Sequence, residues 1–415
     1  MERIVVIGGG VIGITCALQL QHDGYQVTVL DPGAAGEGAS WASCGSIAVS
    51  EVIPLSKPGT LMQAPGWLLD PLGPLTLRAS SLFGVLPWFL RFLRNSRMSR
   101  ISRISEEMAR LGLSARSDLR AFLDRYDLLS LLRSTPVIEL YDTEKELEHE
   151  RTFHDMRRNL GFQLEVISGS VAKEMEPAIA GDFERAVIMH DWRSVVDTKR
   201  FVVELHQAFA ARGGTVVSQK AVGFDSEATR VTGVRTGSGT TVHGDGFVIS
   251  AGAWSKKLAD ELGIQLHLEG VMGYQLNLTD PGVTLNHALI YPKGGFGITP
   301  FETGLAIAGS IEFARLDDAP NWKRADVLAE KAERVIPGLQ TWASERRMGR
   351  RPLTADTKPI IGQAHTIPNL FFNTGHGQLG LTLCATSAKL VSDLVAERTS
   401  SIDISAFSPD RFLAT

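Results

Sequence analysis

Glycines and one acid near the N-terminus have the spacing of a dinucleotide-binding turn. The segment Gly8-Gly9-Gly10-Val11-Ile12-Gly13 has the pattern GxGxxG. The first glycine permits a tight turn, the second lets the backbone approach a pyrophosphate, and the third lets a helix pack close to a sheet. Asp31 follows, with a carboxylate that can accept both ribose hydroxyls and that would repel a 2′-phosphate. The segment therefore predicts a dinucleotide other than NADP, without separating NAD from FAD.

Two adjacent arginines, Arg350 and Arg351, precede Pro352 and could bind a carboxylate. A planar guanidinium offers two parallel hydrogen bonds to such a group. Neighbouring residues on a strand point to opposite faces, so only one of the two arginines can enter a pocket. We expect the other to face solvent or an acid. A structural salt bridge is the alternative role for the arginine that faces inward.

A second glycine-rich loop lies near the C-terminus. Gly375, Gly377 and Gly380 free the backbone to present N–H groups, and a helix that begins near Leu381 directs its positive end to the same point. Reduced flavin carries negative charge at N1 and O2, which such a loop would stabilise. An ordinary glycine turn is the alternative. His376 could orient a substrate, stabilise the anionic flavin or serve only as hydrogen-bonded structure.

The elements that would position these loops follow from hydrophobic periodicity. Residues 3–7 form a continuous apolar run typical of a strand buried on both faces, and a helix over 11–22 and a strand over 26–30 complete a βαβ unit. Further helices are expected over 86–126, 143–160, 197–212 and 381–397, a β-meander over 214–217, 231–236 and 247–250, antiparallel strands within 265–313, and strands at 359–362 and 370–373.

This order predicts an α/β fold. A Rossmann-like dinucleotide-binding domain would be interleaved with an α+β substrate domain that contains an antiparallel sheet. The expected nucleotide domain comprises residues 1–56, 165–256 and 341–415, and the expected substrate domain comprises 57–164 and 257–340. A chain of 415 residues is long enough for both.

Composition limits the classes of partner and the cellular compartment that fit this chain. The net charge of −4 gives no indication of nucleic-acid binding. The three cysteines are far apart and form no CxxC pair, so we expect neither a metal site nor disulfides and favour a reducing, cytoplasmic location. No signal peptide or membrane span is expected. The apolar run 82–90 is followed by Arg91, Arg94, Arg97, Arg100 and Arg103, which indicates either a core helix with a solvated basic face or a contact with the inner membrane surface.

Three further segments resemble the D-amino acid oxidase family of flavoproteins. Val248-Ile-Ser-Ala-Gly-Ala-Trp-Ser255 is similar to the strand and turn that return to the nucleotide. Residues 349–362 are similar to the family's GxRP…D…PIIG block, and residues 373–382 to its C-terminal flavin loop. The resemblance is closest to the bacterial D-amino acid dehydrogenase branch, which includes D-hydroxyproline dehydrogenases, and it implies FAD as the cofactor.

The resemblance also assigns substrate residues. The family's substrate arginine directly precedes the proline, which selects Arg351. Tyr274 stands where the family usually shows a KGY-like strand, although Met272 replaces the lysine. Tyr291 follows an apolar run in the same domain. Either hydroxyl could reach the substrate carboxylate, and a buried tyrosine with a satisfied hydroxyl is the alternative for each.

The resemblance further implies how FAD is held. Relatives of the dimethylglycine dehydrogenase type carry a flavin-linked histidine just after a tryptophan, and Ala42 stands at that position, so we expect non-covalent FAD. Cys44 is expected to be a small packed side chain. The residues expected to contact FAD are Gly8, Gly10, Val11, Ile12, Gly13, Asp31, Ser40, Ser43, Cys44, Gly45, Val222, Ala251, Gly252, Trp254, Gly349, Gly375, Gly377, Gln378, Leu379, Gly380, Leu381 and Thr382.

The implied reaction is oxidative deamination of a small amino acid, with a D-amino acid expected. A hydride passes from Cα to flavin N5, and the imino acid hydrolyses to a 2-oxo acid and ammonia. Desolvation can neutralise the substrate amine, so we nominate no general base. The electron acceptor would be a respiratory quinone or O2. The alternatives are a glycine- or sarcosine-type oxidase of amines that uses O2, a D-hydroxyproline dehydrogenase, an NAD-dependent dehydrogenase, and a flavin-binding subunit whose partner performs the chemistry.

Overall fold

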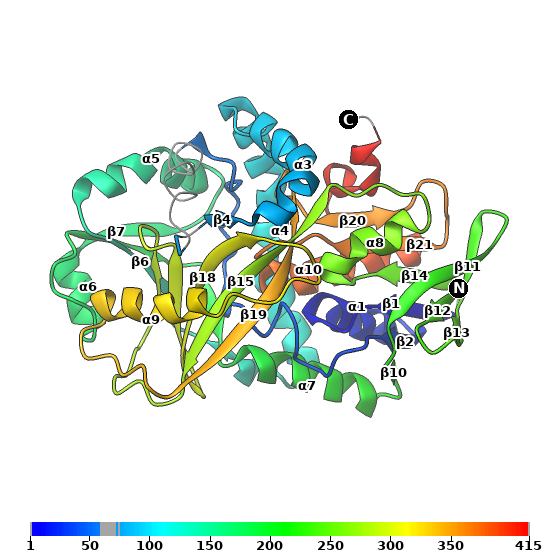
Figure 1. The fold of residues 1–415 in the computed structure, drawn as a ribbon, viewed down its shortest axis with the longest axis horizontal. Helices are drawn as coiled ribbons and strands as arrows, with labels where there is room; N and C mark the ends of the chain where they lie inside the picture. The colour runs from blue at the N-terminus through cyan, green and yellow to red at the C-terminus, as the bar shows by residue number, and fades with distance from the viewer. Residues whose placement is uncertain (1, 59–71, 74, 414–415) are drawn as a thin grey trace.

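The computed structural model describes residues 2–58, 72, 73 and 75–413, and it places two large sheets side by side (Figure 1). The smaller sheet, at the right of the view, has the strand order β10-β2-β1-β14-β21-β20. Its first five strands run parallel, and β20 pairs with β21 in the antiparallel sense. The strands are β1 (Arg3–Ile7), β2 (Gln26–Leu30), β10 (Thr215–Val217), β14 (Gly246–Ile249), β20 (Ile360–Gln363) and β21 (Leu370–Thr374).

The larger sheet has the order β19-β15-β18-β17-β16-β6-β8-β7, with β4 paired to β18. Most of its neighbours are antiparallel, whereas β16 with β6 and β18 with β4 are parallel. Its strands are β4 (Leu75–Leu77), β6 (Val137–Tyr141), β7 (Leu164–Ser168), β8 (Arg185–Met189), β15 (Leu268–Leu278), β16 (Ala288–Tyr291), β17 (Phe296–Phe301), β18 (Gly304–Phe313) and β19 (Ser344–Thr354).

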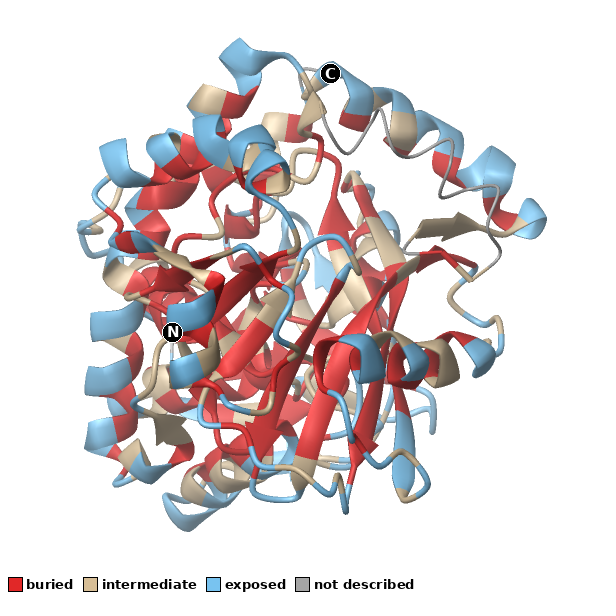
Figure 2. Ribbon diagram, turned by 90° about the vertical axis from the view of Figure 1, so that its left-hand side faces the viewer, coloured by how far each residue is buried: buried red, intermediate tan, exposed pale blue. Residues whose placement is uncertain are grey.

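Helices cover the sheets, and the strands between them consist largely of buried residues (Figure 2). Against the smaller sheet pack α1 (Val11–His22), α7 (Thr198–Ala211) and α10 (Gly380–Val395), and α4 (Met98–Arg125) packs on α10. The larger sheet carries α6 (Gly169–Met175) and α9 (Lys323–Val335). The remaining α-helices of the described residues are α3 (Leu82–Arg94), α5 (Glu144–Asn159) and α8 (Ser255–Asp260). Side chains cap several of these helices, as Asp197 does by accepting the N–H of Arg200 at 2.8 Å.

The predicted α/β fold is confirmed, and the first three elements have the predicted bounds. Two details differ. The helix predicted over 86–126 is two helices, separated at residues 95–97. The predicted meander mixes two structures, because β11 (Ala221–Glu227), β12 (Arg230–Thr236) and β13 (Thr241–His243) form an antiparallel sheet while β10 and β14 join the parallel one.

Strand pairing also departs from the predicted domain boundaries. Strands β7 and β8 fall almost entirely within 165–256, and β19 falls within 341–415, yet all three belong to the larger sheet. Strand β19 pairs along its whole length with β15, from Leu268–Thr354 to Leu278–Ser344. The chain therefore crosses into the larger sheet at places where the local sequence gives no boundary signal.

Candidate active site

A cavity of about 870 Å³ lies where the two sheets meet. The first βα turn, the segment 37–48 and the turn after β14 form its nucleotide end. The loop 375–381, the larger sheet and α3 form its other walls. Its volume lies near the upper end of the range for ligand cavities, which suits a large cofactor together with a small substrate.

The first βα turn is built as its glycines predict. Gly8 has φ +110°, and a Cβ there would lie 2.4 Å from the Ser250 carbonyl oxygen. At Gly13 a Cβ would lie 1.8 Å from the Gly8 carbonyl oxygen, so only glycine lets α1 pack this closely. Beside Gly10 the nearest atom to an added Cβ is Ser40 Oγ, at 3.7 Å. The N-terminus of α1 therefore opens on the cavity, where a pyrophosphate fits.

Asp31 lines the same end of the cavity. Its Oδ2 accepts the N–H of Gly9 at 2.6 Å and its Oδ1 accepts the N–H of Gly33 at 2.7 Å. These bonds fix the carboxylate at the carboxyl end of β2. Each oxygen keeps a second lone pair for a ribose hydroxyl.

The C-terminal loop brings a buried and unpaired histidine to the cavity. Gly375 and Gly377 have positive φ, and α10 begins at Gly380. His376 is 3% exposed, and neither ring nitrogen has a hydrogen-bond partner among the described residues. Burial lowers the pKa of His376 to about 3, so the ring is neutral. A buried polar group in this state fits a wall that contacts a polar ligand such as a flavin.

Arg351 projects into the cavity from β19. Its guanidinium lies over Gly273, where a Cβ would be 2.4 Å from Cζ, and its Nη1 donates to the Ser310 carbonyl oxygen at 3.2 Å. Burial lowers the pKa of this guanidinium, which nevertheless stays charged. Among the described residues no acid forms an ion pair with Arg351. A desolvated cation in this position favours an anionic ligand.

Arg350 behaves differently from our expectation that it faces solvent or an acid. The side chain is buried, and its two terminal nitrogens donate to the carbonyl oxygens of Arg315 at 2.9 Å and Asp318 at 2.6 Å. The expectation was wrong because backbone carbonyls of the 315–318 segment satisfy the guanidinium. Arg350 borders the cavity but is held in place by this loop.

The two predicted tyrosines are both bound to acids. Tyr274 is fully buried and outside the cavity lining, its hydroxyl donates to Glu312, and the N–H of Asn321 donates to it at 2.9 Å. Its expected place at the substrate is thus corrected. Tyr291 lines the cavity, but its hydroxyl donates to Asp142 Oδ1 at 2.9 Å.

Most of the residues expected at FAD line the cavity, and three support it from behind. Gly13 packs against Gly8, and a Cβ at Gly349 would lie 2.7 Å from Ala39 Cα. Thr382 Oγ1 accepts the N–H of Ala48 at 2.9 Å. The lining residues are Gly8, Gly10, Val11, Ile12, Asp31, Ser40, Ser43, Cys44, Gly45, Val222, Ala251, Gly252, Trp254, Gly375, Gly377, Gln378, Leu379, Gly380 and Leu381.

Residues 3–394 match the family model described as FAD dependent oxidoreductase. The chain belongs to this family. The match confirms the predicted family and its cofactor, FAD. The open space at Gly10, the fixed Asp31 and the unpaired His376 supply the groups that such a cofactor needs.

Full-length relatives agree with this assignment. The chain is 28% identical to a D-amino-acid oxidase of Bradyrhizobium diazoefficiens and 30% identical to a D-amino acid dehydrogenase of Methylobacterium sp. (strain 4-46), each over 99% of both chains. In structure it resembles a glycine oxidase of Geobacillus kaustophilus, with a TM-score of 0.77, 21% identity and 99% of each chain covered. An L-proline dehydrogenase of P. horikoshii gives a TM-score of 0.76 at 18% identity, with 100% of this chain and 98% of that chain covered.

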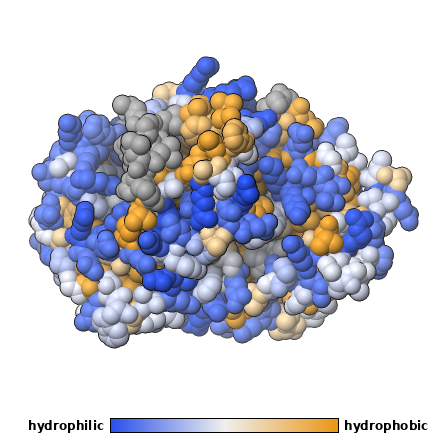
Figure 3. Space-filling model, viewed as in Figure 1, coloured by the Kyte–Doolittle hydropathy of each residue, from blue (hydrophilic) through white to orange (hydrophobic). Residues whose placement is uncertain are grey.

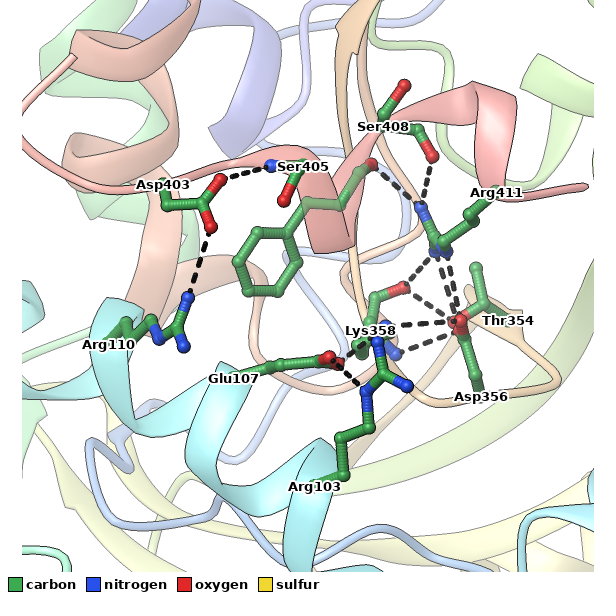
Figure 4. Close-up of polar contacts among 11 residues, drawn as sticks. Arg103, Glu107, Arg110, Thr354, Asp356, Lys358, Asp403, Ser405, Ser408 and Arg411 are labelled. Atoms are coloured by element: carbon green, nitrogen blue, oxygen red, sulfur yellow. Dashed lines mark hydrogen bonds and ion pairs between the residues drawn. The ribbon is translucent and has the colours of Figure 1, made fainter. Parts of the chain in front are cut away.

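Ion pairs and hydrogen bonds hold the loop after β19 in this FAD-dependent oxidoreductase (Figure 4). Asp356 Oδ2 accepts Arg411 Nε at 2.9 Å, and Lys358 Nζ donates to Glu107 Oε2 at 2.7 Å. Burial acts to raise the pKa of Asp356, but Arg411 and Lys358 outweigh it and hold this pKa below its usual range. The N–H of Gly377 donates to the Pro352 carbonyl oxygen at 2.9 Å, which joins the flavin loop to the strand of Arg351.

Sequence analysis missed two groups of lining residues. Trp88, Phe89 and Phe92 of α3 cover the cavity, and Trp88 Nε1 donates to the Leu353 carbonyl oxygen at 3.1 Å. The second group is polar and surrounds Glu139 of β6. Its signal in the sequence was one acid within the apolar run 137–141.

Proposed function

We propose that this FAD-dependent oxidoreductase oxidises the Cα–N bond of a small amino acid, with a D-amino acid as the substrate. The supporting observation is the Arg351 guanidinium, which faces the cavity without an acidic partner among the described residues. A carboxylate matches its geometry and its charge. The names of the relatives, D-amino-acid oxidase and D-amino acid dehydrogenase, support the same reaction.

The chain's own residues position the substrate and exclude water. FAD, when bound in the cavity, would supply the two-electron oxidation of the substrate. Arg351 binds the carboxylate and so fixes Cα, while Trp88 and Phe92 shield the site from solvent. An apolar surrounding lowers the pKa of the substrate amine and favours its neutral form. The imino acid product then hydrolyses in water to a 2-oxo acid and ammonia.

We also propose that FAD is held without a covalent bond. Ala42, the residue after Trp41, offers no atom for a covalent link to flavin. Cys44 lies nearby, but its Sγ is within 3.4 Å of Thr299 Oγ1 and burial raises the pKa of its thiol. A neutral, packed thiol supports a structural role for Cys44.

The test of this function is anaerobic reduction of the bound flavin by single compounds. Small D-amino acids are expected to bleach the yellow colour, whereas their L-enantiomers and amines without a carboxylate should act much more slowly. A panel that includes glycine, sarcosine and D-hydroxyproline examines the alternative substrates. Hydrogen peroxide formation, compared with reduction of a dye, then separates an oxidase from a dehydrogenase. Absence of bleaching by every amino acid would overturn the proposal.

A contact with the membrane surface has its own support in α3. Val85, Trp88 and Phe92 face inward, whereas Leu82, Phe83, Leu86 and Leu90 are exposed, with Phe83 at 86%. Apolar side chains gather over this helix in Figure 3. None of the helices in the described part of the chain could span a bilayer. We propose that α3 lies on an anionic lipid surface, with Arg94, Arg97 and Arg100 near the headgroups, so that electrons can pass to a quinone.

Sedimentation with vesicles tests this contact. The protein should bind vesicles that contain phosphatidylglycerol, and binding should fall as salt rises because the arginines act through charge. Phe83→Asp should abolish it, since the new carboxylate would enter the headgroup region. Trp342→Asp is the matched control, because Trp342 is also exposed, at 73%, but lies outside α3. An equal loss of vesicle binding in both variants, or binding that does not change with salt concentration, would contradict the proposal.

A further inference from the structure

The cavity has a second charged region at Glu139, in the middle of β6. Glu139 is 6% exposed, and its Oε2 accepts the Tyr141 hydroxyl at 3.1 Å. The Tyr141 hydroxyl also lies 3.0 Å from His154 Nε2. Burial lowers the pKa of His154 to about 3, so this ring gives Glu139 no positive charge.

The cations around Glu139 are bound to other acids. Arg157 Nη2 lies 3.3 Å from Glu51 Oε2, and Arg157 Nε donates to the Ser50 carbonyl oxygen at 3.0 Å. Lys57 Nζ lies 2.5 Å from Glu150 Oε2. All of these charged side chains line the cavity. Three carboxylates therefore face two cations, and no lysine or arginine in the described part of the chain forms an ion pair with Glu139.

This charge balance favours a cationic ligand at Glu139. Burial raises the pKa of Glu139, and Arg157 opposes that shift only in part. Either the carboxyl group takes up a proton when the site is empty, or a positive group comes to it. A cationic ligand would compensate the buried carboxylate in a medium where such an attraction is strong.

Strand register places Glu139 and Arg351 on one face of the larger sheet. Glu139 pairs with Ile290, Ile290 with Gly297, and Gly297 with Ala308. Arg351 bonds to Ser310, two residues from Ala308 on β18. Three strand spacings separate β18 from β6, on the order of 14 Å, and the offset from Ala308 to Ser310 adds about 7 Å along the strand, so the two positions are roughly 15 Å apart. After a hydrogen bond of about 3 Å at each end, roughly 9 Å remains for the ligand.

The surface between the two charges is apolar. Ile290, Gly297 and Ala308 line the cavity there. Cys44 packs over Gly297, because its Sγ would lie 2.7 Å from a Cβ added at this glycine. An extended chain of methylene groups matches the apolar character of these residues.

We infer that Glu139 selects a substrate with a cationic side chain, whose α-carboxylate binds Arg351 and whose terminal ammonium or guanidinium binds Glu139. Tyr141 is a positioning residue, because its hydroxyl orients the carboxylate. The inference rests on the proposed oxidation of an amino acid, and it replaces the small side chain expected there with a long cationic one, as in lysine and arginine.

Wild-type protein provides the first test, by anaerobic flavin reduction with D-lysine and D-norleucine. The two share the carbon chain, but norleucine lacks the terminal ammonium. We expect kcat/KM for D-lysine to be at least about 10-fold higher, as expected for a buried charge pair. D-Arginine against D-norvaline is a second pair. Equal rates within each pair would overturn the inference while leaving amino acid oxidation intact, whereas failure of every amino acid would overturn the proposed function as well.

Glu139→Gln provides the second test, since it keeps the shape and removes the charge. The variant should lose about 10- to 100-fold in kcat/KM for D-lysine and change little for D-norleucine. Glu165→Gln is the matched control on β7, where Glu165 pairs with His190 at the surface. Equal losses for both substrates in Glu139→Gln would contradict the inference. If the variant loses its flavin, the comparison of substrates in the wild type decides alone.

Discussion

Replacement of Arg351 by alanine is expected to lower kcat/KM for an amino acid substrate by about 30- to 5000-fold. The variant would lose a charge-assisted pair inside a desolvated cavity, and truncation of such pairs costs about 2–5 kcal/mol. Flavin content and the flavin spectrum should change little, because Arg351 bonds only to Ser310 within the described chain and lines the part of the cavity that we propose for the substrate. Anaerobic stopped-flow reduction, with flavin absorbance as the signal, measures both quantities.

Two comparisons sharpen this prediction. An amine without a carboxylate should react equally with wild type and Arg351→Ala, since it cannot use the guanidinium. Arg350→Ala should mainly lower the melting temperature, because Arg350 holds the carbonyls of Arg315 and Asp318. If Arg350→Ala proved the more damaging change for kcat/KM, the assignment of Arg351 to the substrate would be wrong. If neither variant changed kcat/KM, the substrate would not place a carboxylate here.

The nucleotide end of the cavity could be predicted because its chemistry lies in consecutive residues. The turn from Gly8 to Gly13 and the acid at Asp31 need only one strand, one helix and the next strand, and the hydrophobic pattern shows all three. Alternation along a strand predicts different surroundings for Arg351 and Arg350, and the two guanidinium groups do contact different parts of the chain. The backbone groups that pack against the Arg350 face of β19 could not be predicted from alternation, so the carbonyl partners of Arg350 were missed.

The position of Tyr274 could not be predicted from the sequence, because a β-bulge lies beside it. The register of β15 with β18 shifts between Met272 and Tyr274, and Ser310 on β18 has φ +68°. This bulge changes how residues face one another across the two strands, and Glu312 takes the Tyr274 hydroxyl. Neither the bulge nor the acid partner is visible in the sequence around Tyr274.

Long-range pairing explains the other differences. Strand β19 lies in the third segment predicted for the nucleotide domain, 341–415, yet it pairs with β15 and so belongs to the larger sheet. Glu139 faces the cavity because β6 lies next to β16, about 150 residues later in the chain. A single acid in an apolar strand signals an unusual environment, but only the sheet order shows that Glu139 lies on the same face of the larger sheet as Arg351.

Gly10→Val is expected to give a folded but largely colourless protein. Gly10 has φ −65° and ψ 178°, which any residue adopts, and Ser40 Oγ at 3.7 Å is the nearest atom to an added Cβ. The protein therefore tolerates the side chain, whereas a pyrophosphate at the N-terminus of α1 does not. Flavin released to the supernatant by acid precipitation, which recovers non-covalent FAD, measures occupancy, and circular dichroism measures folding.

Two further glycine variants separate cofactor loss from misfolding. At Gly13 a valine would place Cβ 1.8 Å from the Gly8 carbonyl oxygen, so Gly13→Val should fail to fold. At Gly84, which is exposed on α3, nothing lies within 4 Å of an added Cβ, and Gly84→Val should keep both fold and flavin. Full flavin occupancy in Gly10→Val would mean that the pyrophosphate does not lie at this helix. Unfolding of Gly10→Val together with Gly13→Val would mean that the space beside Gly10 serves the fold, because a cavity kept only for the cofactor can be filled without cost to the apoprotein.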